Sequence, residues 1–242
     1  MASLRGVFVA SLIDVVIVNW NAGDRLRECI DSMLDHDGDV IARVDVVDNA
    51  STDDSLRGIE DLPGVKVIQT GANLGFAAAC NIGASEGGSP YILFLNPDTA
   101  VESGSLLVPL SFMEQPENTN IGICGIQLID EEGEVSRTSA RFPTLWRLTV
   151  SALGLDRFPG MRGGGVHMRD WRHHESCQVD HVIGAFYLMR RKVFDGLGGF
   201  DVQFFVYLED LDLSFRTKLA GYDSWYLTEA RAFHAGGGTS RQ

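Results

Sequence analysis

The first hundred residues alternate between short apolar runs rich in β-branched residues and longer segments with helical spacing. The apolar runs, each expected to be a strand, are Asp14–Asn19, Val44–Val47, Val65–Gln69 and Tyr91–Leu95. The helices expected between them start near Asp24, at Ser51–Asp54 and at Phe76. Strands that alternate with helices predict a mainly parallel sheet, because parallel strands need long crossover connections. The predicted fold class is therefore α/β, with helices flanking the sheet.

Short polar residues follow three of these predicted strands. They are Asn19-Trp20-Asn21, Asp48-Asn49 and Asn96-Pro97-Asp98. In open α/β sheets, ligands bind beyond the carboxyl ends of the strands. Asx residues also favour turns for local backbone reasons, so each group alone is equally well explained as a turn. Their agreement at one edge favours a shared ligand.

The second half of the chain is less regular. We expect a strand over 121–129, a hairpin turn over 130–133, a strand over 179–189 interrupted by Gly184, and a last strand over 222–227. Residues 141–177 show no clear period and contain several arginines and histidines. A loop this long is usually functional or disordered. Within it, the segment Arg157–His174 is either a mobile lid that grips phosphate groups or a solvated loop.

An acidic cluster opens a predicted helix that runs from Glu209 to about Ala220 and ends before Gly221. Glu209 and Asp212 share a face of this helix, whereas Asp210 points elsewhere. Acidic residues also favour helix N-termini through the helix dipole, which is the structural alternative. The apolar residues around the cluster indicate burial, which raises a carboxyl pKa and suits a general base.

Two further positions have the chemistry of metal ligands. Asp98 follows an apolar strand, and Pro97 stiffens the turn that presents it. Its carboxylate suits Mg²⁺ or Mn²⁺, and the alternative is a turn aspartate. His234 is expected in flexible, glycine-rich sequence beyond the last strand, as a metal ligand or an ordinary surface histidine.

Other residues at the strand ends suit recognition of a nucleotide. Asp48 can accept hydrogen bonds from a base or ribose, and Trp20 can stack on a base. Core packing is the more usual role of a lone tryptophan. The segment 71–76, which includes Asn73, matches neither the dinucleotide fingerprint nor a P-loop. The helix N-terminus that follows can still face a phosphate.

The net charge, the cysteines and the longest apolar stretch of the chain argue against several classes of protein. A net charge of −13 argues against a protein that coats nucleic acid. The four cysteines have no paired spacing, which predicts reduced, buried thiols and a cytoplasmic protein. The apolar stretch 7–20 is too short to span a bilayer, and residues 1–13 are expected to be a lead-in.

Six short motifs in order carry a resemblance to a known family. They are Val16–Asn21, Val46–Asp53, Asn73–Phe76, Leu93–Asp98, Gly198–Asp201 and Leu208–Leu213. Together they resemble the family 2 glycosyltransferases of the GT-A fold, in particular the rhamnosyltransferase-like branch. The resemblance implies a single GT-A domain over 14–242, with a nucleotide-binding half at 14–100. The acceptor and catalytic half would cover 101–242, including the loop 141–177.

The resemblance also implies a reaction and its partners. An inverting enzyme of this kind transfers a sugar, here suggested to be rhamnose, from a nucleotide-diphosphate sugar to an acceptor hydroxyl. The acceptor would be a glycan or a lipid-linked glycan of the cell envelope. The expected location is cytoplasmic, with peripheral contact at the inner face of the membrane. Many relatives continue beyond the position of Gln242, so acceptor contacts are expected to be incomplete in this chain.

Residue roles follow from matching this sequence to the family's motifs. Asp210 would be the catalytic base, and Glu209 would orient the acceptor or the base. Asp98 would be the last aspartate of the metal-binding motif, with His234 as a further ligand for Mg²⁺ or Mn²⁺. Asn96 replaces the first aspartate of that motif, which implies a weaker metal site. The residues expected to bind the nucleotide sugar are Asn19, Trp20, Asn21, Asp48, Asn49, Asn73 and Asn96.

Two alternatives have different chemistry. A non-catalytic nucleotide-sugar-binding protein would keep the fold, but the intact Glu209-Asp210 pair argues against it. A sugar nucleotidyltransferase also uses an α/β sheet. It usually needs a glycine-rich basic loop after the first strand, and the segment 19–24 has one glycine and no basic pair.

Overall fold

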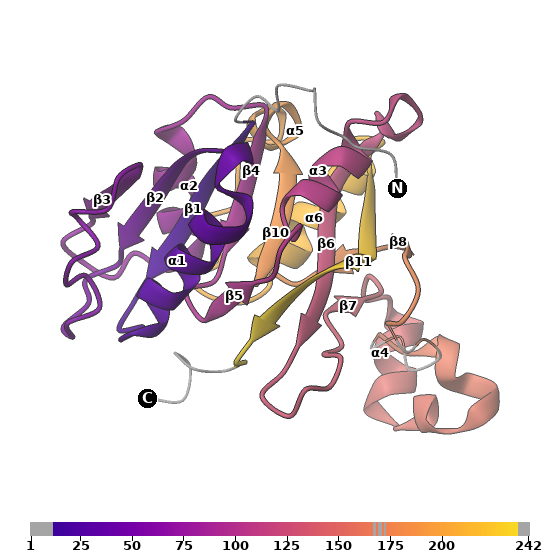
Figure 1. Cartoon of the computed structure of the whole chain (residues 1–242). Coiled ribbons are helices and arrows are strands. Elements are labelled where there is room, and N and C mark those ends of the chain that lie inside the picture. Colours follow the sequence, from indigo (N-terminus) through magenta and orange to yellow (C-terminus); the bar gives the residue numbers. More distant parts are fainter. Residues whose placement is uncertain (1–11, 167, 169–170, 172, 237–242) are drawn as a thin grey trace.

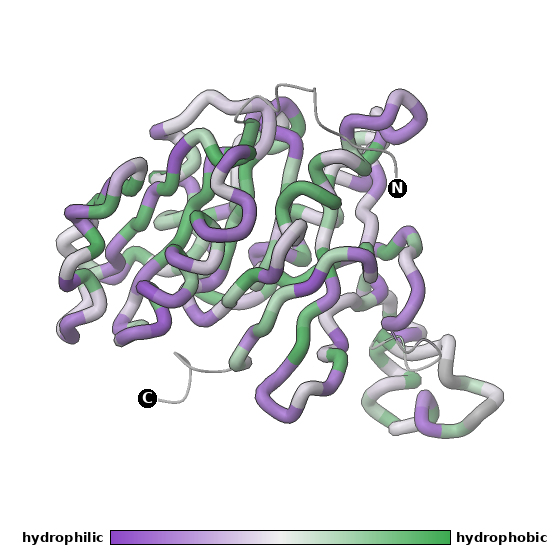
Figure 2. The backbone as a smooth tube through the Cα atoms, in the orientation of Figure 1, coloured by the Kyte–Doolittle hydropathy of each residue, from purple (hydrophilic) through white to green (hydrophobic). Residues whose placement is uncertain are grey.

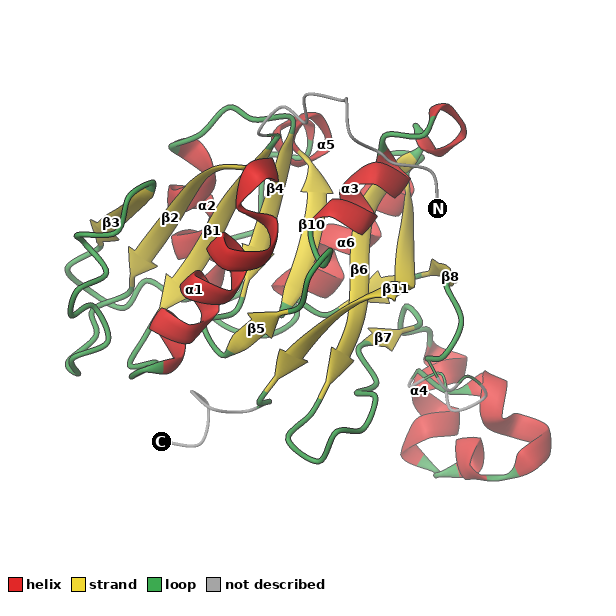
Figure 3. Ribbon diagram, viewed as in Figure 1, coloured by secondary structure: helices red, strands yellow, loops and turns green. Residues whose placement is uncertain are grey.

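A computed structural model describes residues 12–236 of the protein, apart from 167, 169, 170 and 172. Within this part of the chain, nine strands form one sheet in the order β3-β2-β1-β4-β10-β6-β11-β5, with β8 paired to β11 (Figures 1 and 3). The strands of this sheet are β1 (Ile13–Asn19), β2 (Ile41–Asp48), β3 (Val65–Gln69), β4 (Tyr91–Leu95), β5 (Thr99–Val101), β6 (Ile121–Ile129), β8 (Cys177–Val179), β10 (Phe186–Arg190) and β11 (Asp223–His234). A separate two-stranded sheet pairs β7 (Ser139–Ala140) with β9 (His181–Val182).

The sheet is mixed but mainly parallel in its first half, as the alternating pattern predicts. Strands β3, β2, β1 and β4 are all parallel. Strand β10 is inserted antiparallel between β4 and β6, and β11 then pairs in parallel with β6. The antiparallel insertion brings residues just before β10 to the edge where the parallel strands end.

Helices cover both faces of the sheet, so each face has its own core. The helices are α1 (Arg25–Asp37), α2 (Phe76–Ser85), α3 (Leu107–Met113), α4 (Leu145–Ala152), α5 (Arg191–Gly196) and α6 (Glu209–Leu219). Val15 and Ile17 of β1 belong to the core with α1 and α3. Val16 and Val18 belong to the opposite core, with α2, α5 and α6. The middle strands are therefore apolar along their length, as Figure 2 shows.

The helix expected to start at Ser51–Asp54 is not present, and turns occupy this region instead. The capping-type side chains bond elsewhere. Asp53 accepts hydrogen bonds from the Ser55 backbone and from the backbone N–H of Gly23. Gly58 has φ +73°, a conformation that interrupts a right-handed helix. Local hydrogen bonding by Ser and Asp therefore overrides the helix-start pattern.

The segment 141–177 is more ordered than its lack of period predicts. It contains α4, which Thr144 caps by accepting a hydrogen bond from Arg147 N, and the short 3₁₀ turns η3 (Leu155–Arg157) and η4 (Pro159–Gly164). The helix was missed because its apolar residues Leu145, Trp146 and Leu148 face solvent, so no inward-facing stripe exists. Three basic residues of the segment expected to be a lid or a solvated loop, His167, Arg169 and Arg172, lie outside the described residues.

The last strand is longer than predicted, and this corrects the placement of His234. Strand β11 continues past Leu227 through an irregularity in its pairing with β6. It then pairs antiparallel with β5, with His234 opposite Thr99. His234 therefore ends a strand beside Asp98 and does not lie in a flexible tail.

Two other findings bear on the sequence predictions. All four cysteines are free thiols, and all except the half-buried Cys177 are buried. None of the helices in the described ranges combines the length and apolarity needed to span a bilayer. The prediction that residues 1–13 form a lead-in falls almost wholly outside the described residues.

Candidate active site

A cavity of about 670 Å³ opens at the carboxyl edge of the parallel strands. It brings together residues that follow β1, β2 and β4, the segment before β10, and the start of α6. The residues that line it are Val18, Trp20, Asn49, Asn73, Gly75, Phe76, Asn96, Pro97, Asp98, Ile183, Gly184, Ala185, Phe205, Val206, Tyr207, Glu209, Asp210 and His234. Its volume is in the range of small-molecule sites. Most of the residues predicted from sequence for binding or catalysis thus share one cavity.

Asp98 and His234 form a pair on one side of this cavity. Nε2 of His234 is 3.3 Å from Oδ1 of Asp98, and both side chains are largely buried. Burial acts to raise the pKa of the Asp98 carboxyl, but the hydrogen bond and charge of His234 outweigh it and lower that pKa below its usual value. The pair therefore presents an ionised carboxylate and an imidazole nitrogen side by side.

The acidic start of α6 forms another side of the cavity. The helix is entered through Tyr207 and Leu208, whose φ angles of +67° and +71° are left-handed. Residues other than glycine rarely adopt this left-handed backbone conformation, and such backbone strain is concentrated at functional sites. The bend places Glu209 and Asp210 together in the cavity lining. Asp212 is instead paired with Arg216, with 2.7 Å between Oδ2 and Nε, as expected for a structural helix residue.

Asp210 is held by backbone donors from two elements. Its Oδ1 accepts a hydrogen bond from Leu211 N at 2.7 Å, and its Oδ2 accepts one from Gly184 N at 2.8 Å. A carboxylate has about four acceptor positions, so these two bonds fix its orientation and leave capacity for a ligand. Gly184 was visible in the sequence as a break in a strand pattern, which often marks close backbone approach.

Glu209 has a different environment from its neighbour. It is buried, and its Oε2 has no hydrogen-bond partner among the described residues. Burial raises the pKa of this carboxyl to about 7, and the charge of Asp210 acts in the same direction. A carboxyl that titrates near neutrality and faces the cavity can donate or accept a hydrogen bond from a ligand.

Three residues on the opposite side suit a nucleotide. Trp20 is 37% exposed and lines the cavity, so it is not a core residue. Asn49 donates from Nδ2 to Asn73 Oδ1 at 2.9 Å, and its own Oδ1 accepts from Leu74 N at 2.9 Å. These bonds fix the two amides in a cavity that a partly exposed aromatic side chain also lines.

Three other residues predicted to bind the nucleotide do not line the cavity. They are Asn19, Asn21 and Asp48. Asn19 Nδ2 donates to Asp48 Oδ1 at 2.8 Å, and Asn21 Oδ1 accepts from Thr52 N at 2.7 Å. They tie the ends of β1 and β2 to the turns that follow. Asn96 does line the cavity, and its backbone N–H bonds to Ala185 O, which joins β4 to the segment before β10.

The loop before α6 contributes cavity residues that the sequence did not single out. Phe205 O accepts a hydrogen bond from Phe76 N at 2.7 Å. A Cβ at Gly75, which has φ +84°, would lie 2.4 Å from that carbonyl oxygen. Gly75 is therefore required both by its backbone conformation and by the close approach of Phe205. The glycine in the Asn73–Phe76 motif was the available signal.

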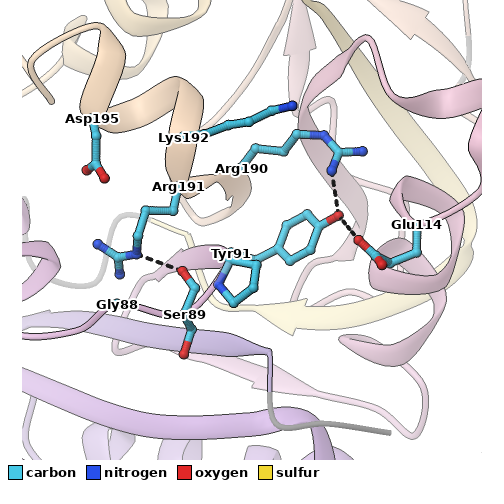
Figure 4. A pocket seen from close by; sticks show the side chains of 9 residues that line it. Gly88, Ser89, Tyr91, Glu114, Arg190, Arg191, Lys192 and Asp195 are labelled. Carbon is cyan, nitrogen blue, oxygen red and sulfur yellow. Dashed lines mark hydrogen bonds between the residues drawn. The ribbon is translucent and has the colours of Figure 1, made fainter.

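A second cavity, of about 350 Å³, lies at the opposite edge of the sheet, next to the start of β4 and the end of β10. Figure 4 shows Arg190 and Glu114 converging on the Tyr91 hydroxyl. Arg191 donates to Ser89 O and Ala84 O and pairs with Asp14 at 2.7 Å. Both arginine side chains are hydrogen-bonded to other parts of the protein. We therefore interpret this cavity as a structural contact between elements and not as a ligand site.

Comparisons with known proteins agree with this fold and show what the chain is similar to. The N-acetylglucosaminyl-diphospho-decaprenol L-rhamnosyltransferase of Mycobacterium tuberculosis is 28% identical over 238 residues, covering 93% of this chain and 76% of that protein. Rhamnosyltransferase WbbL of Escherichia coli K12 is 32% identical over 146 residues, covering 60% and 52%. The structure of GalNAc-T7 with UDP, GalNAc and Mn²⁺ matches with a TM-score of 0.69 at 18% identity, covering 92% of this chain and 43% of that one. The chain thus spans about half or less of the last two proteins.

The sheet order, the acid–histidine pair and the acidic helix start, together with these neighbours, define a glycosyltransferase of the GT-A fold. Within that class, the chain belongs to glycosyl transferase family 2, whose model matches residues 14–198. Its sequence relatives place it with the rhamnosyltransferase-like members.

Proposed function

We propose that the protein transfers a sugar, rhamnose, from a nucleoside diphosphate sugar to the hydroxyl of a lipid-linked glycan, with inversion at the anomeric carbon. One observation carries the proposal. A single cavity is lined by an aromatic residue suited to stack on a nucleotide base, a pair of residues suited to hold a metal, and a carboxylate held in place by backbone N–H groups. These are Trp20, the pair Asp98 and His234, and Asp210. The choice of rhamnose and of a lipid-linked acceptor follows from the mycobacterial relative, which is an N-acetylglucosaminyl-diphospho-decaprenol L-rhamnosyltransferase.

In this reaction Asp210 is the general base. The acceptor oxygen forms a bond to the anomeric carbon while the bond from that carbon to the diphosphate oxygen breaks. The acceptor proton moves to Asp210, whose orientation is set by the N–H groups of Gly184 and Leu211. Attack from the face opposite to the leaving diphosphate inverts the anomeric centre. Glu209, beside the base, is suited to hold a second hydroxyl of the acceptor.

The donor set at Asp98 and His234 fits a divalent cation. One carboxylate oxygen and one imidazole nitrogen, 3.3 Å apart, are ligands that Mn²⁺ accepts, whereas Mg²⁺ would be held mainly by the oxygen. No group of three or more metal-binding side chains gathers in the described ranges. Substrate phosphates can complete the coordination of a cation that few side chains hold. When bound, the cation would offset the charge of the diphosphate. That offset matters because the cavity also holds the carboxyl groups of Glu209 and Asp210.

Binding can be tested before the donor is known. We expect UDP-, GDP- and dTDP-sugars to be distinguished by a thermal-shift panel with and without Mn²⁺ or Mg²⁺. One nucleotide should raise the melting temperature in a metal-dependent way. Transfer is then measured with that donor and a prenyl-diphosphate N-acetylglucosamine acceptor. A chain that shows no shift with any of these ligands would contradict the proposed donor site. Pyrophosphate release from a nucleoside triphosphate and a sugar phosphate would identify a nucleotidyltransferase instead.

A further inference from the structure

The buried side chain of His181 lies directly behind Asp210. His181 is only 6% exposed, and its Nε2 is 3.9 Å from Asp210 Oδ2. Its Nδ1 is 3.3 Å from the hydroxyl oxygen of Ser214. Asp210 and Ser214 are one turn apart on the same face of α6, so a single imidazole spans both positions.

The contacts continue from Ser214 into the core. The hydroxyl oxygens of Ser214 and Tyr187 are 3.0 Å apart, and both residues are fully buried. His181 is held from its other side by β7, where Ala140 is its strand partner. A line of polar groups therefore runs from Tyr187 through Ser214 and His181 to Asp210. Buried networks of this kind fix orientation when each member has a partner.

The charge state of His181 follows from its surroundings. Burial lowers the pKa of this imidazole, and the nearby charge of Asp210 acts to raise it, with a net shift below the usual value. Asp180, the adjacent acidic residue, is paired with Arg147 at 3.5 Å. At neutral pH the ring is therefore neutral and carries one N–H. If Tyr187 donates to Ser214 and Ser214 donates to Nδ1, that N–H is on Nε2, the atom nearest Asp210.

We propose that His181 is a positioning residue for Asp210. Its buried ring presents Nε2 toward Oδ2 at 3.9 Å, beyond direct hydrogen-bond distance, and keeps the carboxylate aimed into the cavity. The inference rests on the proposed function only for the role of Asp210 as the base. Removing the polar ring takes away this neighbour of the carboxylate and loosens its orientation.

Three variants test this role. His181→Leu removes the donor at similar volume, His181→Gln keeps an N–H donor, and Ser214→Ala removes the partner of Nδ1. We expect His181→Leu to lower kcat about tenfold and to leave KM for the donor sugar within about twofold. His181→Gln should restore most of kcat, and Ser214→Ala should fall between the two. Wild-type kcat in a folded His181→Leu protein would overturn the proposal.

A second measurement needs no substrate. NMR of the ring nitrogens reports which nitrogen of His181 carries the proton. We expect the Nε2–H form in the wild type at neutral pH, and a shift of the Nε2 resonance in Asp210→Asn. An Nδ1–H form would overturn the proposed geometry even if the enzyme transfers sugar. Failure of the wild type to transfer any sugar, with the Nε2–H form intact, would instead contradict the proposed function and leave the geometry standing.

Discussion

The two cavities lie at opposite edges of one sheet and differ in how their charged groups are satisfied. At the amino edge, Arg190 and Arg191 donate to backbone carbonyls and to neighbouring side chains. At the carboxyl edge, Glu209 has a buried oxygen without a partner among the described residues, and Asp210 keeps acceptor capacity. Charge alone would favour the arginine cavity for an anionic ligand. The carboxyl edge is nevertheless the better candidate for the reaction, because its carboxyl groups keep capacity for a ligand and the arginines of the amino edge are bonded to protein.

The largest effect should come from the carboxyl edge. Asp210→Asn keeps the size and the hydrogen-bonding shape of the side chain but removes the base. We expect the transfer rate to fall about a thousandfold, with an unchanged melting temperature, because general-base catalysis contributes on this order. The rate is measured with saturating donor and acceptor. Transfer near the wild-type rate would remove Asp210 from the mechanism.

A substitution at the amino edge of the sheet should lower the unfolding free energy of the protein and leave its transfer rate unchanged. Arg191→Met leaves the buried Asp14 without its cationic partner, while its hydrogen bonds from Ser89 remain, and this loss costs about 3 kcal/mol of unfolding free energy. Chemical denaturation measures this loss, and the transfer rate per folded molecule should stay unchanged. Lys192→Met, at an exposed neighbouring position, is the matched control and should cost less than about 0.5 kcal/mol. A catalytic defect specific to Arg191→Met would contradict the structural role of this cavity.

A smaller effect is expected at the metal-type pair. Replacing His234 by Ala leaves Asp98 as a single donor, so the Mn²⁺ concentration for half-maximal transfer should rise about tenfold, equivalent to about 1.4 kcal/mol. The rise in melting temperature with Mn²⁺ and nucleotide should weaken in parallel. His36→Ala, at an exposed histidine of α1, should change neither quantity. Equal metal responses in both variants would argue against the pair as a metal site.

The smallest effect concerns the pH dependence of stability. The pKa of Glu209 is raised to about 7 in the folded protein, so the folded state binds this proton more tightly than the unfolded chain. The associated stability is full below the unfolded pKa of about 4.3 and is lost as pH rises through about 7. Glu209→Gln keeps the group neutral. It should be nearly as stable as the wild type near pH 5 and more stable by about 1–2 kcal/mol near pH 8.

Thermal unfolding at both pH values measures this difference. An advantage of Glu209→Gln that is equal at the two values would show that Glu209 does not titrate in this range.

The sequence predicted the parallel half of the fold and the edge that holds the cavity, because those signals are local. Segments such as Asp14–Asn19 and Tyr91–Leu95 are mostly apolar and β-branched or aromatic, so their own composition predicts a buried strand. The position of His234 depends on pairing between β11 and β5, which no local pattern encodes. Likewise, Ser51 and Asp53 match a helix start but bond to residues after β1. His181 was missed because its role arises only where β9 meets α6.

Strand β11 comes late in the chain and pairs with β5 at the edge of the sheet, so the two sides of the cavity form at different times during synthesis. A ribosome makes the residues of β1 to β4 early, so this parallel half can begin to assemble before the rest of the sheet has been made. His234 is made long after Asp98, in the final strand of the sheet. A partly synthesised chain can therefore hold the Trp20 side of the cavity before the Asp98–His234 pair exists. If Asp98 and His234 hold a metal as proposed, binding of a nucleotide sugar to the unfinished chain would be weak, and the proposed transfer would begin only after the last strand has paired.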